Sequence, residues 1–201
     1  MTGLRMRLRG AGLLLACAAL LPACVTLRDH AAMPRALPSN WDDRRGELQA
    51  LTRFDLQGRL AVASGEQGFS AALRWSQRSD RARLEVDGPL GVDGLRVDLE
   101  RGRLPDEAVR AELEQRLGFA LPLESLRYWM LGVPDPARAA EERRDADSPT
   151  LAALTQDGWT VLYTRYARVA DGDYELPQRI EVTRESVRVR LLIERWGRVR
   201  Q

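Results

Sequence analysis

The chain is poor in the residues from which catalytic and metal sites are usually built. Its 201 residues include one histidine, His30, and two cysteines, Cys17 and Cys24, all within the first 30 positions. The remaining chain therefore lacks thiols for a disulfide framework, cysteine–histidine sets for a metal centre and the imidazole that a nucleophilic serine needs as its base. No glycine-rich phosphate loop follows a strand pattern. We expect no enzyme activity, no metal and no cofactor.

Lysine is absent, so all 31 basic residues are arginines, and they face 29 acidic residues. Three of these arginines lie between residues 5 and 9, which leaves 28 basic against 29 acidic residues in the rest of the chain. Neighbouring arginines such as Arg143 and Arg144 follow glutamates, which is typical of a solvated surface. A balanced domain has no strong field to attract nucleic acid, so we expect no nucleic-acid partner.

The N-terminal apolar run is too short to span a bilayer. It extends over 11 residues from Ala11 to Leu21, whereas a transmembrane helix needs about 20. The run follows the three arginines and leads into Leu21-Pro22-Ala23-Cys24, which is the order of a lipoprotein signal. We expect residues 1–23 to be removed as a signal peptide and Cys24 to carry the acyl chains. The chain then works outside the cytosol, held to a membrane by lipid.

A second tetrapeptide, Leu14-Leu15-Ala16-Cys17, fits the same signal. Its apolar core has only about five residues, below the roughly 7 to 15 of a signal peptide, so Cys24 is the favoured site. A secreted protein with an incidental cysteine is the third alternative. Prolines and little apolar periodicity predict an extended tether over residues 24–40. Residues 41–201 are enough for one domain with a single core.

Apolar residues alternate with polar ones along several stretches of this domain. The alternation runs over residues 54–62 and, after a glycine turn at 65–68, over residues 69–75. Shorter runs follow at 84–86 and 95–99, and the last third of the chain adds more. A period of two residues is typical of antiparallel strands with one wet face. We therefore predict a mainly β fold with about seven to ten strands.

Three segments have the features of helices. The first begins at Trp41, behind Asn40 as its cap. The second covers residues 106–117, where apolar residues recur four positions apart. The third opens at Pro122, because a proline costs no hydrogen bond in the first turn, and it closes before Gly132. Two or three helices are thus expected to accompany the sheet.

Two stretches are predicted to be loops. Residues 135–150 are charged and irregular, which indicates a long surface loop. Gly88-Pro89-Leu90-Gly91 specifies a tight turn between strands, with Leu90 at its tip. Two alternatives for Leu90 stay open at this point. The side chain either enters the acyl region of a bilayer or folds back and covers one end of the sheet.

The inward positions of the strands and of the third helix hold several wide aromatic rings, including Trp75, Trp129 and Trp159. A curved sheet with a helix over its open side can fill its middle with such side chains. It can also leave an apolar hollow for a ligand. Periodicity gives the face of each residue and does not choose between these alternatives.

The chain resembles the LolB family of outer-membrane lipoprotein receptors. The resemblance covers nearly all of the chain after Cys24, and no single motif in it is diagnostic. The matching residues, in order, are Trp41, Leu56-Gln57-Gly58-Arg59-Leu60, Trp75, Gly88-Pro89-Leu90-Gly91, Gly118, Leu121-Pro122-Leu123, Trp129, Gly132, Pro134, Gln156-Asp157-Gly158-Trp159, Tyr163, Tyr166, Leu176-Pro177 and Trp196.

The resemblance implies an incomplete antiparallel β-barrel, LolA/LolB-like, closed by α-helices around a hydrophobic cavity. It implies a monomer that takes triacylated lipoproteins from the periplasmic carrier LolA and inserts them into the inner leaflet of the outer membrane. Val25 after Cys24 suits that location, because aspartate there would favour retention in the inner membrane. The resemblance also makes Gly88, Pro89, Leu90 and Gly91 a loop that assists insertion into lipid.

On this basis the inward apolar residues become the expected walls of an acyl-chain cavity. They are Phe54, Leu56, Leu60, Val62, Phe69, Leu73, Trp75, Leu84, Val86, Leu126, Trp129, Met130, Trp159, Val161, Tyr163 and Leu191.

One departure concerns residues 100–105, where the family has room for an additional strand that is shortened or lost here. Two rival functions stay open. A structural lipoprotein of an envelope complex would have a filled core and no lipid ligand. A lipid-modifying hydrolase would need a nucleophile with a base.

Overall fold

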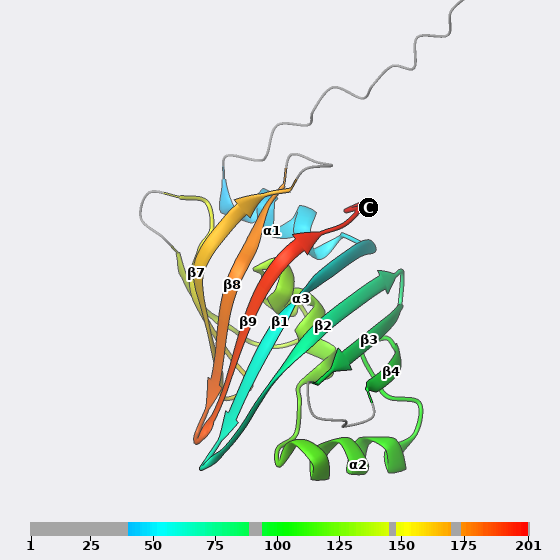
Figure 1. The fold of residues 1–201 in the computed structure, drawn as a ribbon. Coiled ribbons are helices and arrows are strands. Elements are labelled where there is room, and N and C mark those ends of the chain that lie inside the picture. Colours follow the sequence, from blue (N-terminus) through cyan, green and yellow to red (C-terminus); the bar gives the residue numbers. More distant parts are fainter. Residues whose placement is uncertain (1–39, 89–93, 145–147, 170–173, 201) are drawn as a thin grey trace, which may run out of the picture. The chain divides into compact units, whose positions relative to one another are not determined.

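A computed structural model describes residues 40–88, 94–144, 148–169 and 174–200 of the protein. Within these ranges the chain forms three helices and one antiparallel sheet of nine strands (Figure 1). The helices are α1 (Trp41–Gln49), α2 (Glu107–Leu117) and α3 (Leu123–Leu131). The strands are β1 (Arg53–Ser64), β2 (Gln67–Arg78), β3 (Arg81–Asp87), β4 (Leu95–Glu100), β5 (Glu141–Arg144), β6 (Leu151–Gln156), β7 (Trp159–Arg168), β8 (Glu175–Arg184) and β9 (Val187–Trp196).

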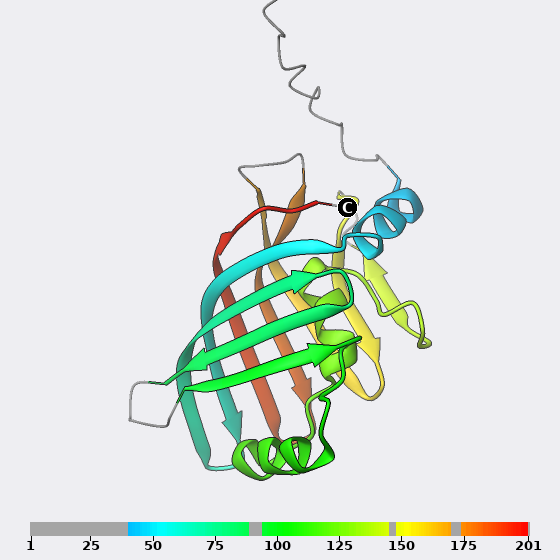
Figure 2. The same cartoon turned by 90° about the vertical axis from the view of Figure 1, so that its right-hand side faces the viewer.

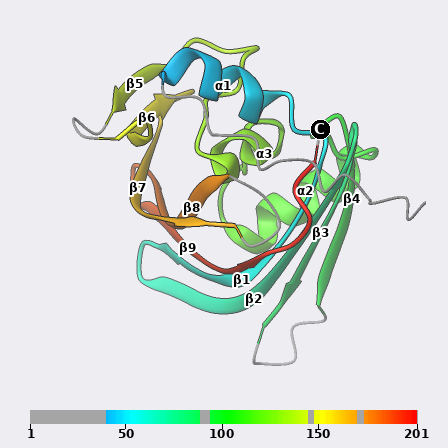
Figure 3. The same ribbon diagram turned by 90° about the horizontal axis from the view of Figure 1, so that it is seen from above.

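The strand order in the sheet is β4-β3-β2-β1-β9-β8-β7-β6-β5. Most neighbours follow one another in sequence, and the pairing of β1 with β9 joins the first strand to the last. Because β4 and β5 form the two edges, the sheet is open rather than a closed barrel. Seen from above, it curves around α3 (Figure 3). The predicted fold class, an incomplete antiparallel barrel accompanied by helices, is confirmed.

A register shift in the pairing of β1 with β9 lies between Gln57 and Gly58. There the two strands approach so closely that a Cβ atom at Gly58 would lie 2.1 Å from the carbonyl oxygen of Leu192. Only glycine fits this approach without a shift of the backbone. Such irregularities increase the local twist, which helps the long central strands to curve.

Helix α1 begins at the predicted Trp41, and α2 and α3 begin one residue after the predicted Asp106 and Pro122, which are their N-caps. The Asn40 side chain accepts a hydrogen bond of 2.8 Å from the backbone N–H of Asp43 and caps α1. Helix α2 ends at Gly118 and α3 ends at Gly132, both with left-handed backbone at φ 77° and 80°, a conformation that favours glycine. No helix in the described ranges is long and apolar enough to cross a membrane.

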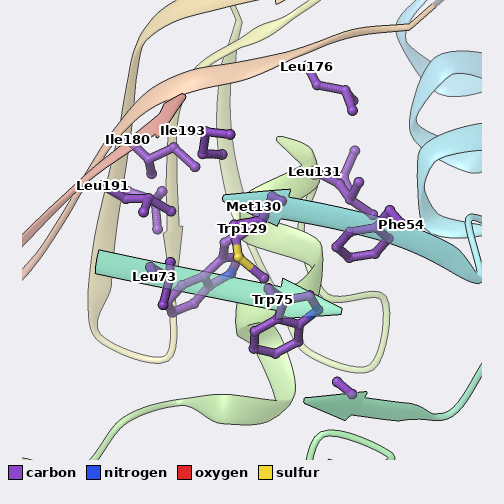
Figure 4. Close-up of a cluster of buried hydrophobic side chains, with 14 of the residues drawn as sticks. Phe54, Leu73, Trp75, Trp129, Met130, Leu131, Leu176, Ile180, Leu191 and Ile193 are labelled. Carbon is purple, nitrogen blue, oxygen red and sulfur yellow. The ribbon is translucent and has the colours of Figure 1, made fainter. Parts of the chain in front are cut away.

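The core lies between the concave face of the sheet and α3, with α1 beside α3 at one end. Figure 4 shows Trp75 and Leu73 of β2 pointing toward Trp129 and Met130 of α3. At the α1 end the packing is dense, and Phe54 and the other side chains there are buried. Burial of such apolar side chains contributes about 1.5–3 kcal/mol each.

Residues 135–150, predicted as a loop, contain strand β5, so that prediction is wrong in part. The strand is short and all four of its residues are charged, which leaves no alternation to recognise. Glu142 accepts hydrogen bonds from Trp41 and Arg45 of α1. Charged residues on an edge strand discourage pairing with other chains.

Residues 100–105, where a family strand was expected to be shortened or lost, form a tight turn. Glu100 and Arg103 pair in one isolated bridge, and the described chain then leads through Leu104 into α2. Leu104 is buried and closes the turn against the core. No named strand lies between β4 and α2 in the described chain.

Candidate functional site

An apolar cavity of about 390 Å³ lies between the concave face of the sheet and the helices α2 and α3. Its walls come from β1, β2, β3, β4, β8 and β9, from both helices and from the segment between them. The residues that line it are Leu60, Val62, Gly68, Phe69, Ser70, Ala71, Leu73, Trp75, Leu84, Val86, Gly88, Leu95, Leu113, Leu117, Phe119, Leu121, Leu126, Trp129, Met130, Ile180, Val182, Val189 and Leu191.

The cavity occupies one half of the curved sheet. Along β1, the first inward residues, Phe54 and Leu56, are buried in the packed core beside α1 and α3. The later ones, Leu60 and Val62, line the cavity. One continuous alternation of apolar residues thus passes from a solid region into a hollow one, because α3 covers only part of the strand length (Figure 2).

The cavity reaches the surface near the hairpin between β1 and β2. Phe69, which lines it, has 42% of its surface exposed, whereas Leu73, two inward positions further along β2, has 7%. Helix α2 lies at the same end of the sheet as this hairpin (Figures 1 and 2). We call the opening beside Phe69 and α2 the mouth.

Helix α2 forms one wall of the mouth with little packing of its own. Leu113 is its one buried side chain among those described, Leu117 is half-buried and Val109 is 39% exposed. All three are apolar, and Leu113 and Leu117 face the cavity. The wall made by α2 is therefore held mainly by two leucines.

None of the described lining side chains can carry a charge, and the polar atoms of the two tryptophans are bonded elsewhere. The Trp129 indole N–H donates to Gln156 Oε1 at 2.9 Å, and the Trp75 indole N–H donates to Gln77 Oε1 at 3.2 Å. Tyr163 donates to the carbonyl of Trp129 at 3.1 Å, and burial raises the pKa of its hydroxyl well above the usual value. Among the described lining residues Ser70 supplies the one side-chain hydroxyl, and the other side chains offer apolar contact.

Eleven of the sixteen predicted wall residues line this cavity. They are Leu60, Val62, Phe69, Leu73, Trp75, Leu84, Val86, Leu126, Trp129, Met130 and Leu191. The other five are buried in the packed core and do not line it, which corrects their assignment as walls. They are Phe54, Leu56, Trp159, Val161 and Tyr163.

The prediction missed several apolar wall residues. They are Ala71, Leu95, Leu113, Leu117, Phe119, Leu121, Ile180, Val182 and Val189. Seven of these belong to runs that the sequence had already marked as strand or helix, so the apolar periodicity signalled their inward direction. Phe119 and Leu121 lie between two helices, where no periodicity exists to mark them.

Two further predicted sites fall largely outside the described residues. Cys24, the predicted lipid attachment site, and Pro89, Leu90 and Gly91 of the predicted insertion loop are not described. Gly88 is described, and it lines the cavity at the end of β3. Of the predicted loop, Gly88 thus belongs to the cavity wall.

Comparisons with known proteins give concordant results. The family model described as outer membrane lipoprotein LolB matches residues 52–196 of this chain. The outer-membrane lipoprotein LolB of Pseudomonas paraeruginosa strain PA7 is 34% identical over 189 residues, which cover 89% of this chain and 91% of that protein. The LolB protein of Nitrosococcus oceani is 33% identical over 188 residues, covering 88% and 92%.

One solved structure similar to this chain is a domain from Vibrio parahaemolyticus, described as belonging to an outer-membrane lipoprotein-sorting protein. It aligns with a TM-score of 0.41 at 8% identity and covers 80% of this chain and 91% of its own.

Proposed function

This chain belongs to the LolB family of outer-membrane lipoproteins, and we propose that its apolar cavity shelters the acyl chains of a lipoprotein in transit. It is an outer-membrane lipoprotein that faces the periplasm, receives lipoproteins from LolA and anchors them in the outer membrane. The observation that carries the proposal is the uncharged hollow of about 390 Å³ between sheet and helices. A structural lipoprotein with a filled core would have no need of it.

The cavity volume bears on how much of a client is held. Ligand pockets usually have volumes of about 300–1,000 Å³, and 390 Å³ lies at the lower end of that range. A client with three acyl chains is larger than the ligands of most such pockets. We therefore expect the cavity to widen when it is loaded, and α2, with its two inward leucines, is the least packed wall.

The thermodynamics of transfer require that acyl chains pass between cavities without meeting water. At about 0.8 kcal/mol per methylene, exposure of one whole chain costs more than about 10 kcal/mol. A handover from the mouth of the carrier to the mouth beside Phe69 avoids this cost. Tighter binding in the receiving cavity makes the transfer directional, because each 1.4 kcal/mol of binding free energy raises the affinity about tenfold. The acyl chains then pass from this cavity into the membrane, where they are bound most stably.

The partners in this proposal are the carrier LolA, triacylated lipoprotein clients and the inner leaflet of the outer membrane. The protein acts as a monomer anchored through Cys24, after removal of residues 1–23, with residues 24–40 as tether and 41–201 as the single lipoprotein-binding domain. No cofactor or catalytic residue takes part.

Occupation of the cavity is tested with a fluorescent fatty-acid probe. Ala71 is buried and lines the cavity, whereas its neighbour Ala72 is exposed on the other face of β2. Ala71→Phe places a ring in the hollow and is expected to weaken probe binding at least about tenfold. Ala72→Phe adds the same ring outside and should bind like the wild type. Equal binding by both variants would mean that the probe does not enter the cavity.

The insertion loop is tested separately. We propose that Leu90 enters the acyl region of the membrane, where full immersion contributes about 1.5–3 kcal/mol. Leu90→Glu should lower the transfer of lipoprotein from carrier to liposomes while leaving probe binding unchanged. Leu192→Glu is the matched control, since Leu192 is also an exposed leucine, on β9. Transfer by Leu90→Glu at the rate of the control would refute the insertion role.

A further inference from the structure

Four arginines align across neighbouring strands at one end of the sheet. Arg53 at the start of β1 is paired with Arg78 at the end of β2, and Arg78 is paired with Arg81 at the start of β3. On the other side, Arg53 forms an isolated bridge with Arg200 beyond β9. Strands are about 4.8 Å apart, so these residues, here called the arginine row, extend over about 15 Å.

The arginine row lies on the outer face of the sheet. All four residues are exposed, and each adjoins an inward residue that is buried: Phe54, Gln77, Ala82 and Val199. Arg78 forms an ion pair of 2.9 Å with Asp55. In the described part of the chain no carboxylate lies within 4.0 Å of the guanidinium groups of Arg53, Arg81 or Arg200, although Glu100 stands opposite Arg81 in the register with β4.

The strand ends and turns directly beside the row carry more arginines than carboxylates. Residues 53–55, 78–81, 100–101 and 198–200 contain six arginines and three carboxylate side chains, whereas α1 at the same end has two arginines and three carboxylates. Like charges placed opposite one another across strands lower stability. The row and the turns beside it therefore carry a local excess of positive charge, which an anionic partner would stabilise.

The position of the row relative to the mouth and to the tether indicates the kind of partner. The mouth lies beside α2 and the β1–β2 hairpin, at the opposite end of the strands (Figure 1). Helix α1, which begins after Asn40, lies at the same end as the row. Only 16 residues separate Cys24 from Trp41, a span of at most about 55 Å. A lipid-anchored chain thus holds the row within reach of the headgroups at high effective concentration.

We propose that the arginine row binds anionic phospholipid headgroups of the membrane in which the protein is anchored. The planar guanidinium group matches phosphate oxygens in a two-bond geometry, and each arginine near an anionic surface adds a modest attraction. With the row on the membrane, the mouth at the other end faces the periplasm, where a loaded carrier arrives. Release of the row then lets the mouth turn toward the bilayer. The inference rests on the proposed function for the anchor and the mouth.

The test measures which end of the domain lies near the lipid. The acylated full chain is reconstituted into vesicles of phosphatidylcholine, with or without phosphatidylglycerol, and a fluorophore is attached at Ala50→Cys or at Glu66→Cys. Both residues are exposed, Ala50 after α1 and Glu66 in the β1–β2 turn. With a quencher in the headgroup region, phosphatidylglycerol should raise quenching at position 50 about twofold or more relative to position 66, and salt should reverse this.

The variant Arg53→Gln, Arg81→Gln, Arg200→Gln should abolish that contrast. A matched triple, Arg59→Gln, Arg83→Gln, Arg190→Gln, changes the net charge equally at arginines that form ion pairs elsewhere on the sheet, and should retain it. The proposal would be overturned if phosphatidylglycerol did not raise quenching at position 50 relative to position 66. It would also be overturned if both triple variants lost this increase equally. Binding of the fatty-acid probe is measured in parallel, and a failure confined to that measurement would concern the cavity and not the row.

Discussion

Two glycines of this chain have opposite surroundings and predict opposite effects of the same substitution. A Cβ atom at Gly58 would lie 2.1 Å from a backbone oxygen of β9, whereas at Gly46, inside α1, nothing lies within 4 Å. Gly58→Ala should destabilise the fold by about 2–3 kcal/mol, because the strands must separate. Gly46→Ala should stabilise it by about 0.5–1 kcal/mol, because alanine favours a helix.

Urea unfolding of both variants measures these changes. Similar midpoints for the two would show that the close approach of β1 and β9 at Gly58 does not constrain the fold. The Gly46 substitution also controls for any general effect of replacing glycine on the unfolded chain.

At the same scale, the inward direction of a residue could be predicted from the sequence, but its surroundings could not. Phe54 and Val62 belong to one alternation on β1, yet Phe54 is fully buried in the core and Val62 lines the cavity. The difference arises from how far α3 extends over the strand, which is a long-range property. Alternation reports the face of a residue and carries no information on what lies opposite that face.

Among the elements, α3 is fixed at its N-terminal turn by Glu124. Burial raises the pKa of this carboxyl, but hydrogen bonds from Arg138 and Arg103 lower it by more, so the pKa lies below its usual 4.5. A lowered pKa means that the ion pairs stabilise the fold fully above pH 4.5, and that this contribution is lost as the pH falls through the lower value.

The variant Glu124→Gln should therefore be less stable than the wild type at pH 7, by up to about 1 kcal/mol, since the pairs are partly exposed. The two proteins should converge in thermal unfolding as the pH falls below 4.5. A difference that persists unchanged at pH 3 would indicate that Glu124 acts through packing rather than charge.

Helix α2 has so few buried side chains that its local stability should be low. Regions with little apolar burial open without global unfolding. We expect amide hydrogens of α2 to exchange at least about tenfold faster than those of the central strands β1 and β9. Addition of a fatty acid should slow exchange in α2, because Leu113 and Leu117 then contact the ligand. Exchange in α2 as slow as in β1 would argue against widening of the cavity at this wall.

Whether a helix or strand could be predicted from the sequence depended on whether its signals are local. Helix α1 was located correctly because its cap, Asn40, and its acidic first turn are local signals. Strand β5 was missed because Glu141–Arg144 has no apolar residue, and pairing with β6 alone defines it. Local chemistry can be recognised in sequence, whereas an edge strand held by its neighbour cannot.

For the whole molecule, the two ends of the sheet have different tasks. The end beside α1 is densely packed and carries the arginine row, and the other contains the cavity and its mouth. An empty apolar cavity lowers the stability of the fold, because its walls lack contacts that a filled core would have. The dense packing at the α1 end compensates for this loss. A ligand that fills the hollow should therefore restore stability to the entire domain.

This leads to a measurable change in thermal unfolding. A ligand that binds only the folded state stabilises it by about 2.7 kcal/mol at one hundred times its Kd. For a domain of this size, 1 kcal/mol shifts the Tm by about 2–4 °C, so a saturating fatty acid should raise the Tm by about 5–10 °C. Ala71→Phe should already be more thermostable or neutral and should lose most of the shift, whereas Ala72→Phe should keep it. A wild-type Tm that does not respond to fatty acid would refute the proposal that this cavity holds acyl chains.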